Sequence, residues 1–543
     1  MAVEMTFIAV PIYVNDPAEL EACLARAGRA IAAGARLIEW RVDALAEAPD
    51  AADAVVRLVE NSPGPCIVTC RPISEGGSFA GEESSRVVLF ESLAAAEQRP
   101  RYVDVELAAW RRALDVRPAV ERMVGDDAQP RPIETGLILS SHDLAGRPRD
   151  LLQRIEAMTN DPACAVVKVA WTARSLRDNL EAFDLLAERR KPTIALCMGR
   201  FGLMSRVLAG KFGGFLTFAT DAPGGQSAPG QPTIDELRSL YRFDSIGRET
   251  KVYGVIGWPV EQSRSPHIHN AGFEAVGHDG VLLPMPIPPE YEHFKATVGA
   301  MIDHRRLDFR GAAVTIPHKE HLLRFVLERG GRADPLTERI GAANTLIVGS
   351  AGGLACTNTD APAAIEALCA GMRPGPRNME GKRVALLGAG GVARAVLAGL
   401  IDAGAAVSVF NRTSARAEAL AEEFGGRETA SGQRKQVTIG EMSEIARERF
   451  EIIINCTPIG MAGGPDPGGS PLPADAQIDD GVTVFDTVYA PVRTPLLREA
   501  EARGARIVSG MDMFIRQAAM QFEKWTGVPA PMATFETVLR DRT

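Results

Sequence analysis

The sequence predicts an α/β protein in which an amino-terminal (β/α)8 (TIM) barrel is fused to two further α/β domains, the second with a Rossmann fold. Three observations predict this organisation. Short apolar segments alternate with helical patterns eight times within the first 220 residues. A glycine-rich turn joins a strand pattern to a helical pattern near residue 390. Charged side chains, two lysines among them, stand at or after the ends of predicted strands.

The composition is typical of a globular protein. The 543 residues are 46% hydrophobic with a net charge of −9, so the chain can form several apolar cores. No basic run suggests a nucleic-acid partner, and no segment reaches the roughly 18 apolar residues of a membrane span. The first residues lack the pattern of a signal or transit peptide. We expect a cytoplasmic location, because the eight cysteines include no Cys-x-x-Cys pair and none has a histidine at metal-ligand spacing.

Eight strand–helix units in so short a stretch favour a closed barrel over an open sheet. The predicted strands are 7–12, 37–42, 66–70, 102–107, 136–140, 166–170, 193–198 and 215–220. Apolar residues at helical spacing lie between most of them, for example in 20–33, 87–96, 151–158 and 176–187. The connection between the fourth and fifth strands is the least regular, because it contains several prolines.

Polar residues gather at the carboxyl ends of these strands, where a (β/α)8 barrel carries its active site. They are Glu39, Arg41, Arg71, Glu75, Glu106, His142 and Lys168. A single charge at a strand end is usually just solvated. So many at successive ends predict one common site.

Lys168 lies within an otherwise apolar strand pattern, ACAVVKVAWTA. One interpretation is a buried ion pair with Glu39 or Glu106, because an unpaired buried ammonium is costly. The other is a lysine kept as a neutral amine by desolvation and neighbouring cations, which attacks a carbonyl and forms a Schiff base. His142, one strand earlier, would then move protons near neutral pH. A class I aldolase fits the same pattern.

The motifs IEWRVD, TCRPISEGG, SSHD, VVKVAW, CMGRFGLMSR and SAPGQ together resemble type I 3-dehydroquinate dehydratase over residues 5–240. The resemblance implies that Lys168 forms an imine with the substrate ketone, that His142 moves the protons and that Glu75 assists His142. Arg206 would bind the substrate carboxylate, which suits a bidentate guanidinium. The other implied residues hold hydroxyls and tune charge (Glu39, Arg41 and Arg71) or close over the substrate as a lid (Ser227 and Gln231).

A new α/β pattern begins after a short linker at 243–251. Ser265 and Pro266 open a helix, with serine as the expected N-cap and proline at the first helical position. That role does not explain Ser263, and two hydroxyls before a helix can hold a carboxylate. Lys319, in GAAVTIPHK, would be solvent-exposed on its own, so its assignment depends on Asp360 and the motifs that follow.

A strand, a glycine-rich turn and a helix then follow in RVALLGAGGVARAVLAGLIDAG, at 383–404. Gly388, Gly390 and Gly391 stand where a dinucleotide pyrophosphate meets a helix N-terminus. An NAD site would place an acidic residue at the end of the next strand, but the sequence there reads NRTSAR. This favours NADP(H), with its 2′-phosphate held by Asn411, Arg412, Thr413 and Arg416.

The motifs SRSP, TIPHK, GAANT, TNTD, GAGGVARA, NRT, NCTPIGM, DTVYAPVRTPLL and GMDMFIRQAA together resemble shikimate dehydrogenase over residues 251–540. The resemblance implies hydride transfer between NADP(H) and the substrate, with Lys319 and Asp360 as a pair at the reacting oxygen. The implied substrate-binding residues are Ser263, Ser265, Thr315, Asn344, Tyr489 and Gln517. The implied cofactor-binding residues are Gly388, Ala389, Gly390, Gly391, Val392, Ala393, Asn411, Arg412, Thr413, Arg416, Thr457, Gly510 and Met513.

Together the resemblances imply two consecutive steps, dehydration of 3-dehydroquinate and NADPH-dependent reduction of 3-dehydroshikimate to shikimate, neither of which needs a metal. The expected domains are the barrel at 1–242, a substrate-binding domain at 251–360 completed by 515–543, and the Rossmann domain at 361–514. A preference for quinate in catabolism and a non-catalytic, metabolite-sensing role remain alternatives. The oligomeric state is left open.

Overall fold

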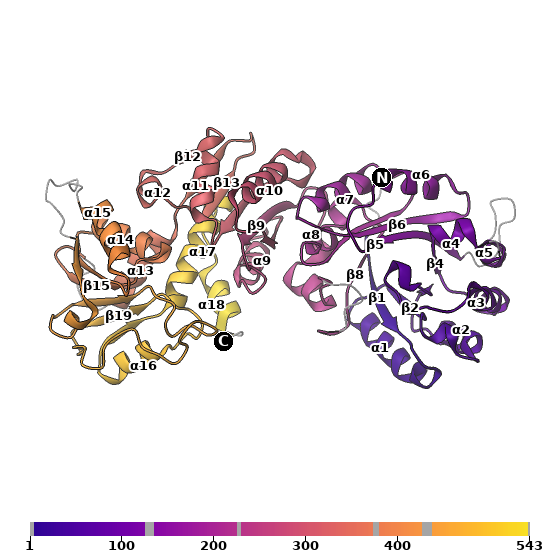
Figure 1. Ribbon diagram of the computed structural model, residues 1–543, viewed down its shortest axis with the longest axis horizontal. Helices are drawn as coiled ribbons and strands as arrows, with labels where there is room; N and C mark the ends of the chain where they lie inside the picture. The colour runs from indigo at the N-terminus through magenta and orange to yellow at the C-terminus, as the bar shows by residue number, and fades with distance from the viewer. Residues whose placement is uncertain are drawn as a thin grey trace. The chain divides into compact units, whose positions relative to one another are not determined.

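The computed structural model describes residues 5–113, 115–124, 135–224, 230–372, 379–425 and 437–540. Within these ranges the chain forms two compact units, with the main boundary between Lys251 and Val252. The strands form one eight-stranded and two six-stranded sheets, and Figure 1 shows helices packed around them.

Eight parallel strands form the sheet of the first unit. They are β1 (Phe7–Tyr13), β2 (Leu37–Arg41), β3 (Cys66–Thr69), β4 (Tyr102–Glu106), β5 (Gly136–Asp143), β6 (Cys164–Thr172), β7 (Thr193–Met198) and β8 (Leu216–Phe218). The strands pair in the order β7-β6-β5-β4-β3-β2-β1-β8. The amide of Phe215 donates to the carbonyl of Thr193 at 2.9 Å, next to β8 and β7, so the sheet is nearly closed into a barrel. The predicted barrel fold is confirmed.

Helices follow the strands and cover the outside of the barrel (Figure 1). They are α1 (Leu20–Ala32), α2 (Ala51–Glu60), α3 (Glu83–Ala95), α4 (Leu107–Arg112), α5 (Val116–Val124), α6 (Leu151–Asn160), α7 (Asp178–Ala187) and α8 (Leu203–Val207), with a π-helix, η5 (Glu236–Leu240), at the end. Helix α2 shows why they form: Ala51, Ala54, Val55 and Leu58 are buried at helical spacing and make one apolar face. The irregular connection between β4 and β5 contains α4 and α5.

After the barrel, the chain forms a mixed six-stranded sheet that starts with β9. Its strands are β9 (Lys251–Gly257), β10 (Gly280–Pro286), β11 (Phe309–Val314), β12 (Arg332–Ala333), β13 (Thr345–Val348) and β14 (Leu354–Thr357), in the order β10-β9-β11-β13-β14-β12. β9 is parallel to β11, and β13 is antiparallel to both β11 and β14. The helices are α9 (Ser265–Ala275), α10 (Tyr291–Asp303), α11 (Lys319–Glu328) and α12 (Pro335–Ile340).

The second six-stranded sheet is parallel throughout. Its strands are β15 (Arg383–Leu387), β16 (Ala406–Phe410), β17 (Val437–Gly440), β18 (Ile452–Asn455), β19 (Thr483–Asp486) and β20 (Arg506–Val508), in the order β17-β16-β15-β18-β19-β20. This is the strand order of a Rossmann fold, which confirms the prediction; its chain order reverses direction between β15 and β18. The accompanying helices are α13 (Asp360–Gly371), α14 (Gly391–Asp402), α15 (Ser414–Gly425) and α16 (Pro495–Ala502).

Two carboxyl-terminal helices, α17 (Gly510–Thr526) and α18 (Met532–Arg540), follow β20. Helix α17 begins in the Rossmann core, where Met513 is buried. Its other end reaches the first six-stranded sheet, because Trp525 Nε1 donates to the carbonyl of Leu346 at 2.9 Å. Phe535 of α18 and Phe522 of α17 pack edge to face, with ring centroids 5.6 Å apart.

The start of α9 differs from the prediction by one residue. Ser265 is the first helical residue rather than the N-cap, and Arg264 takes the cap position without a side-chain cap bond. Ser263 Oγ accepts a hydrogen bond from the amide of Ser265 at 3.3 Å. The expected capping role therefore belongs to Ser263, whose hydroxyl lies outside the helix.

In the described part of the chain, none of the helices combines the length and the apolar character that crossing a membrane requires.

The close packing of α9 against α18 gives a stability prediction. A Cβ added at Gly272 would lie 2.5 Å from Phe535 Cε1 and 3.0 Å from Phe522 Cε2. We expect Gly272→Ala to lower the free energy of unfolding by about 1–3 kcal/mol through overpacking, measured by urea unfolding of the full chain. Gly28→Ala in α1, where nothing lies within 4 Å, is the matched control and should be neutral or stabilising. Equal stability of the two variants would contradict this packing.

Candidate active sites

Side-chain alternation in the barrel strands places the polar residues of the first site. Successive residues of a strand point to opposite faces, so residues two apart share a face. Val166 belongs to the apolar interior of the barrel, and Lys168 therefore also points inward, one layer closer to the carboxyl end of β6. Three other strands follow the same rule. Their interior residues Leu37, Ile67 and Ile138 are followed two positions later by Glu39, Thr69 and Ser140, which also face inward. Two positions further on come Arg41, Arg71 and His142.

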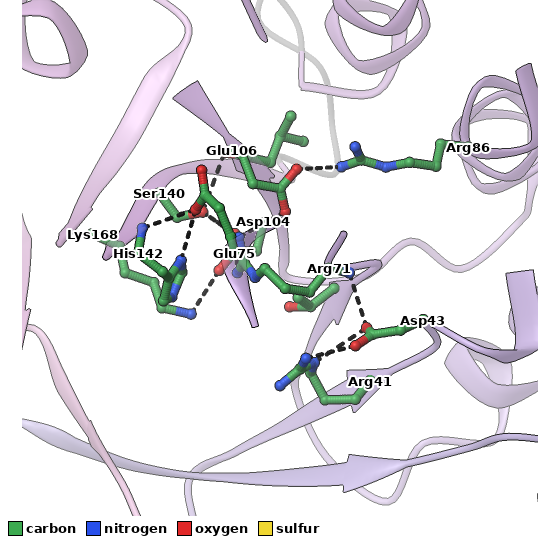
Figure 2. A network of polar contacts seen from close by, with 12 residues as sticks. Arg41, Asp43, Arg71, Glu75, Arg86, Asp104, Glu106, Ser140, His142 and Lys168 are labelled. Atoms are coloured by element: carbon green, nitrogen blue, oxygen red, sulfur yellow. Dashed lines mark hydrogen bonds and ion pairs between the residues drawn. The ribbon is translucent and has the colours of Figure 1, made fainter. Parts of the chain in front are cut away.

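Arg71 is the centre of a buried network of charges (Figure 2). Its NH2 lies 2.7 Å from Asp104 Oδ1, and its NH1 lies 2.7 Å from Glu106 Oε1. The same NH1 donates to Ser140 Oγ at 2.6 Å. On the far side of Glu106, Arg86 NH2 lies 2.7 Å from Oε2. Buried charges need such partners because their desolvation is costly.

Lys168 pairs with two carboxylates. Its Nζ donates to Asp104 Oδ2 at 2.7 Å and lies 3.5 Å from Glu39 Oε1. It also lies 4.7 Å from the centroid of the Phe218 ring. The sequence offered Glu39 or Glu106 as the ion-pair partner of Lys168, and Glu39 lies near it. Glu106 does not pair with Lys168, because Arg71 and Arg86 bind its two carboxylate oxygens.

His142 and Glu75 form the second part of this site. Glu75 Oε2 accepts the backbone amide of His142 at 2.8 Å and lies 3.1 Å from His142 Nδ1. Burial, together with the charges of Arg71 and Lys168, holds the pKa of His142 well below its usual value, so the imidazole is neutral. Burial raises the pKa of Glu75 to about 7. With Nδ1–H donating to Glu75, Nε2 is free to accept a proton.

These side chains line a cavity of about 240 Å³. Its lining includes seven residues predicted from the sequence: Glu39, Arg41, Arg71, Glu75, His142, Lys168 and Arg206. Burial lowers the pKa of Arg206 to about 10, and its Nε has no hydrogen-bond partner among the described residues, which suits a site for an anion. Gln231 is buried but does not line the cavity, and Ser227 lies outside the described residues.

Residues of the second predicted site share one edge of the mixed sheet. β9 and β11 are parallel and end at Gly257 and Val314, while the antiparallel β13 begins at Thr345 beside the end of β11. β14 ends opposite it, with Thr357 paired to Thr345. Every predicted residue that follows or precedes these strand ends therefore lies at the same edge: Ser263, Ser265, Thr315, Lys319, Asn344 and Asp360.

Lys319, Asn344 and Asp360 are joined by hydrogen bonds. Lys319 Nζ donates to Asp360 Oδ2 at 2.6 Å, and Asn344 Nδ2 donates to Asp360 Oδ1 at 2.9 Å. Asn344 is fixed in turn, because its Oδ1 accepts the amide of Thr359 at 2.9 Å. Lys319 and Asp360 open the helices α11 and α13, so both side chains stand on rigid backbone.

Gln517 and Tyr489 both contact Phe514. Gln517 Nε2 donates to the carbonyl of Phe514 at 3.1 Å, and the Tyr489 ring stacks on Phe514 with centroids 5.1 Å apart. Gln521, one turn further along α17, reaches the cluster around Asp360, because its Nε2 donates to the carbonyl of Asn344 at 3.1 Å.

A larger cavity, of about 470 Å³, borders the segment before Asp360. It is lined by Asp334, Leu336, Thr357, Asn358, Thr359, Pro362, Met520, Glu523 and Lys524. None of the residues predicted from the sequence lines it.

The glycine-rich turn follows β15 and leads into α14. Gly388 has a φ of +106°, which favours glycine, and an added Cβ would lie 3.0 Å from the carbonyl oxygen of Cys456. Around Gly390 and Gly391 nothing lies within 4 Å of an added Cβ. Helix α14 starts at Gly391 with Gly390 as its cap and no side-chain cap bond, so its first amides point into open space. Ala389, Val392 and Ala393 complete this segment.

The other predicted cofactor residues follow neighbouring strands of the same sheet. Asn411, Arg412, Thr413 and Arg416 come directly after β16, and the last three are exposed. Thr457 follows β18, where its Oγ1 donates to Asn455 Oδ1 at 2.7 Å. Gly510 opens α17 beside the chain after β19: an added Cβ would lie 2.4 Å from the carbonyl oxygen of Val488. Met513 is buried in the core of this domain, so its side chain is mainly a packing residue.

Sequence reasoning missed several residues of the first site, namely Asp43, Arg86, Asp104 and Ser140. Asp104 precedes Glu106 by two in the same strand and so faces the same way, which was a usable signal. Asp43 pairs with Arg41 at 2.6 Å and accepts the amide of Arg71 at 2.9 Å. No signal in the sequence indicated Arg86, which comes from a helix.

No group of three or more histidine, cysteine, aspartate or glutamate side chains in the described ranges is arranged to hold a metal ion.

Four family models match segments in the barrel, the mixed-sheet domain, the Rossmann domain and the carboxyl-terminal helices. Residues 8–248 match the model of type I 3-dehydroquinase. Residues 255–346 match the shikimate dehydrogenase substrate binding domain, 372–459 match shikimate / quinate 5-dehydrogenase, and 510–540 match the shikimate 5′-dehydrogenase C-terminal domain.

Individual relatives repeat this division. The chain is 37% identical over 517 residues to the chloroplastic bifunctional 3-dehydroquinate dehydratase/shikimate dehydrogenase of Arabidopsis thaliana, which covers 93% of this chain and 80% of the relative. It is 42% identical over 290 residues to the shikimate dehydrogenase (NADP(+)) of Methanocella arvoryzae, covering 53% of this chain and 98% of that one. The crystal structure of shikimate 5-dehydrogenase from Thermus thermophilus with NADP(H) and shikimate aligns with 33% identity and a TM-score of 0.46, over 54% and 100% of the two chains.

The raised pKa of Glu75 predicts a pH-dependent stability. The pKa of a glutamate is ordinarily 4.5, and that of Glu75 in the folded protein is about 7. Between these pH values the folded protein keeps a proton on Glu75 that the unfolded chain has lost. The free energy of unfolding therefore falls as the pH rises through this window. We compare the free energy of unfolding of Glu75→Gln with that of the wild type at each pH. We expect this difference to favour the variant by about 1–3 kcal/mol more at pH 8 than at pH 5. Urea unfolding at both pH values, followed by tryptophan fluorescence, measures the difference. A difference that does not change with pH would show that Glu75 is not desolvated as described.

Proposed function

The chain belongs to the family of bifunctional 3-dehydroquinate dehydratase/shikimate dehydrogenases, and we propose that its two halves catalyse two consecutive reactions. The barrel dehydrates 3-dehydroquinate to 3-dehydroshikimate, and the second half reduces 3-dehydroshikimate to shikimate. The observation that carries this proposal is the presence of two separate lysine sites, one with Lys168 against Asp104 inside a barrel and one with Lys319 against Asp360 beside a nucleotide-binding fold.

In the barrel, Lys168 is the proposed nucleophile. Its amine attacks the ketone carbon of the substrate, and loss of water leaves a protonated imine. Removal of the neighbouring proton puts an electron pair on carbon, and the protonated imine accepts this pair far better than a neutral ketone does. The hydroxyl beta to the imine then leaves, and water hydrolyses the imine, which releases the ketone product and the free amine of Lys168. Asp104, 2.7 Å from Nζ, is the anion that stabilises the positive charge throughout.

His142 and Glu75 are the proposed proton carriers. The neutral imidazole takes the proton next to the imine at Nε2 and later returns it to the leaving hydroxyl. Glu75 holds Nδ1 at 3.1 Å, which fixes the tautomer and stabilises the imidazolium when it forms. A pKa of about 7 for Glu75 allows it to exchange protons near neutral pH.

Substrate recognition in the barrel is assigned to the cations and acids that line the cavity. Arg206, buried without a carboxylate partner among the described residues, is the proposed partner of the substrate carboxylate. Glu39, Arg41 and Arg71 contact hydroxyls. Ser227 and Gln231 are assigned to the loop that covers the substrate, on the resemblance of SAPGQ alone.

In the second half, Lys319 and Asp360 are the proposed pair at the reacting oxygen. Asp360 holds Lys319 Nζ at 2.6 Å, so that the ammonium gives its proton to the oxygen as the ketone becomes an alcohol. Asn344, which also donates to Asp360, and Thr315 are assigned to the substrate hydroxyls, with Gln517 and Tyr489 shaping the pocket. Ser263 lies just before α9 and Ser265 is its first residue, so two hydroxyls at a helix N-terminus suit a carboxylate.

The residues of the Rossmann domain fit NADP(H). The uncapped N-terminus of α14 and the open space above Gly390 and Gly391 suit a pyrophosphate, contacted by the segment from Gly388 to Ala393. Arg412 and Arg416, exposed after β16 with no acidic residue at the strand end, suit a 2′-phosphate, with Asn411 and Thr413 as donors. Thr457, Gly510 and Met513 are assigned to the nicotinamide side. When bound, the cofactor supplies the hydride.

The domain boundaries and the compartment are proposed on similar grounds. The barrel comprises 1–242, the substrate-binding domain 251–360 with 515–543, and the Rossmann domain 361–514; the bonds of Gln521 and Trp525 to Asn344 and Leu346 support the return of the carboxyl terminus. All eight cysteines are free thiols, which suits the reducing cytoplasm.

Two lysine variants test the separation of the activities. Lys168→Ala should abolish dehydration of 3-dehydroquinate and borohydride trapping of the substrate, while reduction of 3-dehydroshikimate continues. Lys319→Ala should slow that reduction by about 10²–10⁴-fold, the usual range for general acid–base catalysis, and leave dehydration intact. Spectrophotometric assays of both reactions, with peptide mass mapping of the trapped adduct, measure the outcome.

Lys382→Ala is the control, because this lysine forms an ion pair with Glu451 at the amino end of β15, the opposite end of that strand from the glycine-rich turn. A folded variant in which either lysine change removed both activities would contradict the two-site proposal. The same assays with quinate in place of shikimate decide which substrate is preferred.

The cofactor assignment is tested by Arg412→Ala. Loss of a cation at the 2′-phosphate should raise the KM for NADPH about 10-fold, which corresponds to about 1.4 kcal/mol. The KM for NADH, which lacks that phosphate, should stay the same and serves as the control within the same variant. An equal rise for both cofactors would show that Arg412 does not bind the 2′-phosphate.

A further inference from the structure

Five buried side chains of alternating charge run from helix α3 into the barrel site (Figure 2). In order they are Arg86, Glu106, Arg71, Asp104 and Lys168, and each neighbouring pair lies 2.7 Å apart. The sequence of charges is therefore positive, negative, positive, negative, positive. Only the inner members, Arg71 and Lys168, line the cavity. Arg86 and Glu106 do not touch the space that the substrate would occupy.

The outer two members are more completely buried than an ordinary structural ion pair. Arg86 is 0% exposed and Glu106 is 1% exposed. Well-packed apolar residues can often replace a buried ion pair without loss of stability. Two outer charges at this depth are therefore better explained by an effect on the inner ones than by a contribution to folding.

Glu106 fixes the orientation of Arg71. With NH1 engaged by Glu106 and by Ser140 Oγ, the guanidinium presents NH2 to Asp104 at 2.7 Å. Ser140 Oγ also donates to Asp104 Oδ1 at 2.6 Å, so that Asp104 is held on one side by Arg71 and Ser140. Its other oxygen, Oδ2, is left to Lys168.

Asp104 is consequently a permanent anion. Burial alone raises its pKa, but the charges of Arg71 and Lys168 outweigh burial and hold the pKa of Asp104 well below its usual range. Such a weak base does not accept the proton that Lys168 must lose before attack. That proton has to pass to His142 or Glu75, and Asp104 remains as the counter-ion of the imine.

We propose that Arg86 and Glu106 are positioning residues of the dehydratase site, which through Arg71 set the orientation and the local charge of Asp104 against Lys168. The inference rests on the proposed dehydratase function. Arg86 forms an ion pair with Glu106, and Glu106 forms a second ion pair with Arg71. Removing either outer residue therefore changes the net charge that the reacting groups experience, and the two removals change it in opposite directions.

Several other groups lie close enough to Lys168 or Arg86 to affect the electrostatic potential there. Those that face Lys168, or act on it from the surrounding strands and loops, are Glu39, Arg41, Arg71, Glu75, Asp104, His142 and Arg206. Those that face Arg86 are Glu83, Cys70 and Glu106, with the rings of Phe79 and Phe90. Apart from Glu106, these groups are unchanged in the variants below, so that differences between pH profiles report the charge that was removed.

The experiment compares the pH dependence of kcat/KM for dehydration in Glu106→Gln and Arg86→Met. Glu106→Gln makes the site more positive, which favours the deprotonated forms of His142 and Glu75. Its acidic limb should move to lower pH. Arg86→Met makes the site more negative and should move the same limb to higher pH. Each shift should be about 0.5–1.5 pH units, the effect expected when a unit charge is removed from a protein interior at this distance from the titrating groups.

Two further variants separate charge from packing. The double variant Arg86→Met/Glu106→Gln restores the net charge, and its pH profile should return toward that of the wild type even if its activity is reduced. Arg86→Lys keeps the charge and should keep the position of the acidic limb. The reductase activity of the same chain gives the concentration of folded protein, and fluorescence of the buried Trp40 and Trp171 reports folding of the barrel.

Shifts in the same direction, or losses of activity without any shift, would overturn the positioning role. Should Arg86→Met fail to fold, Glu106→Gln and Arg86→Lys decide the question, since the proposal requires a downward shift in the first and none in the second. A wild-type protein that neither dehydrates 3-dehydroquinate nor forms a borohydride adduct would refute the dehydratase function itself, which is a distinguishable result.

Discussion

The contact between Asp104 and Lys168 is the interaction on which the rest of the barrel site depends. It keeps an ammonium inside an apolar barrel at acceptable cost, because Asp104 is itself neutralised by Arg71 and Ser140. The neutral state of His142 follows from the same arrangement, since the charges of Arg71 and Lys168 add to the effect of burial. One set of pairings therefore holds the ammonium of Lys168 in the barrel and keeps the neighbouring imidazole neutral.

Much of this architecture could be predicted from the sequence, because strand periodicity is a local property. Apolar strand patterns with polar residues at their ends predicted that Lys168 and His142 share one barrel site, and glycine at residue 388 marked the turn before α14. The partners of Lys168 could not be predicted in the same way. Asp104 and Glu106 have the same orientation on β4, and only the three-dimensional positions of Arg71 and Arg86 explain why Glu106 pairs with these arginines and not with the lysine.

The second half shows the same limit. The motifs led us to expect that Lys319 and Asp360 form a pair, and the two side chains are hydrogen-bonded, since sheet topology brings the neighbouring strand ends to one edge. They misplaced the cap of α9 by one residue, because helix ends depend on backbone geometry that a serine–proline pair does not determine. They also overlooked Gln521, whose bond to Asn344 links segments 177 residues apart.

Helix α17 has a mechanical consequence. Its first turns are anchored in the Rossmann core through Met513, and its last turns are anchored to the mixed sheet through Gln521 and Trp525. A single rigid rod is thus shared by the domain assigned to the cofactor and the domain assigned to the substrate. A tilt of this rod would therefore move the Rossmann core and the backbone that carries Asn344 together.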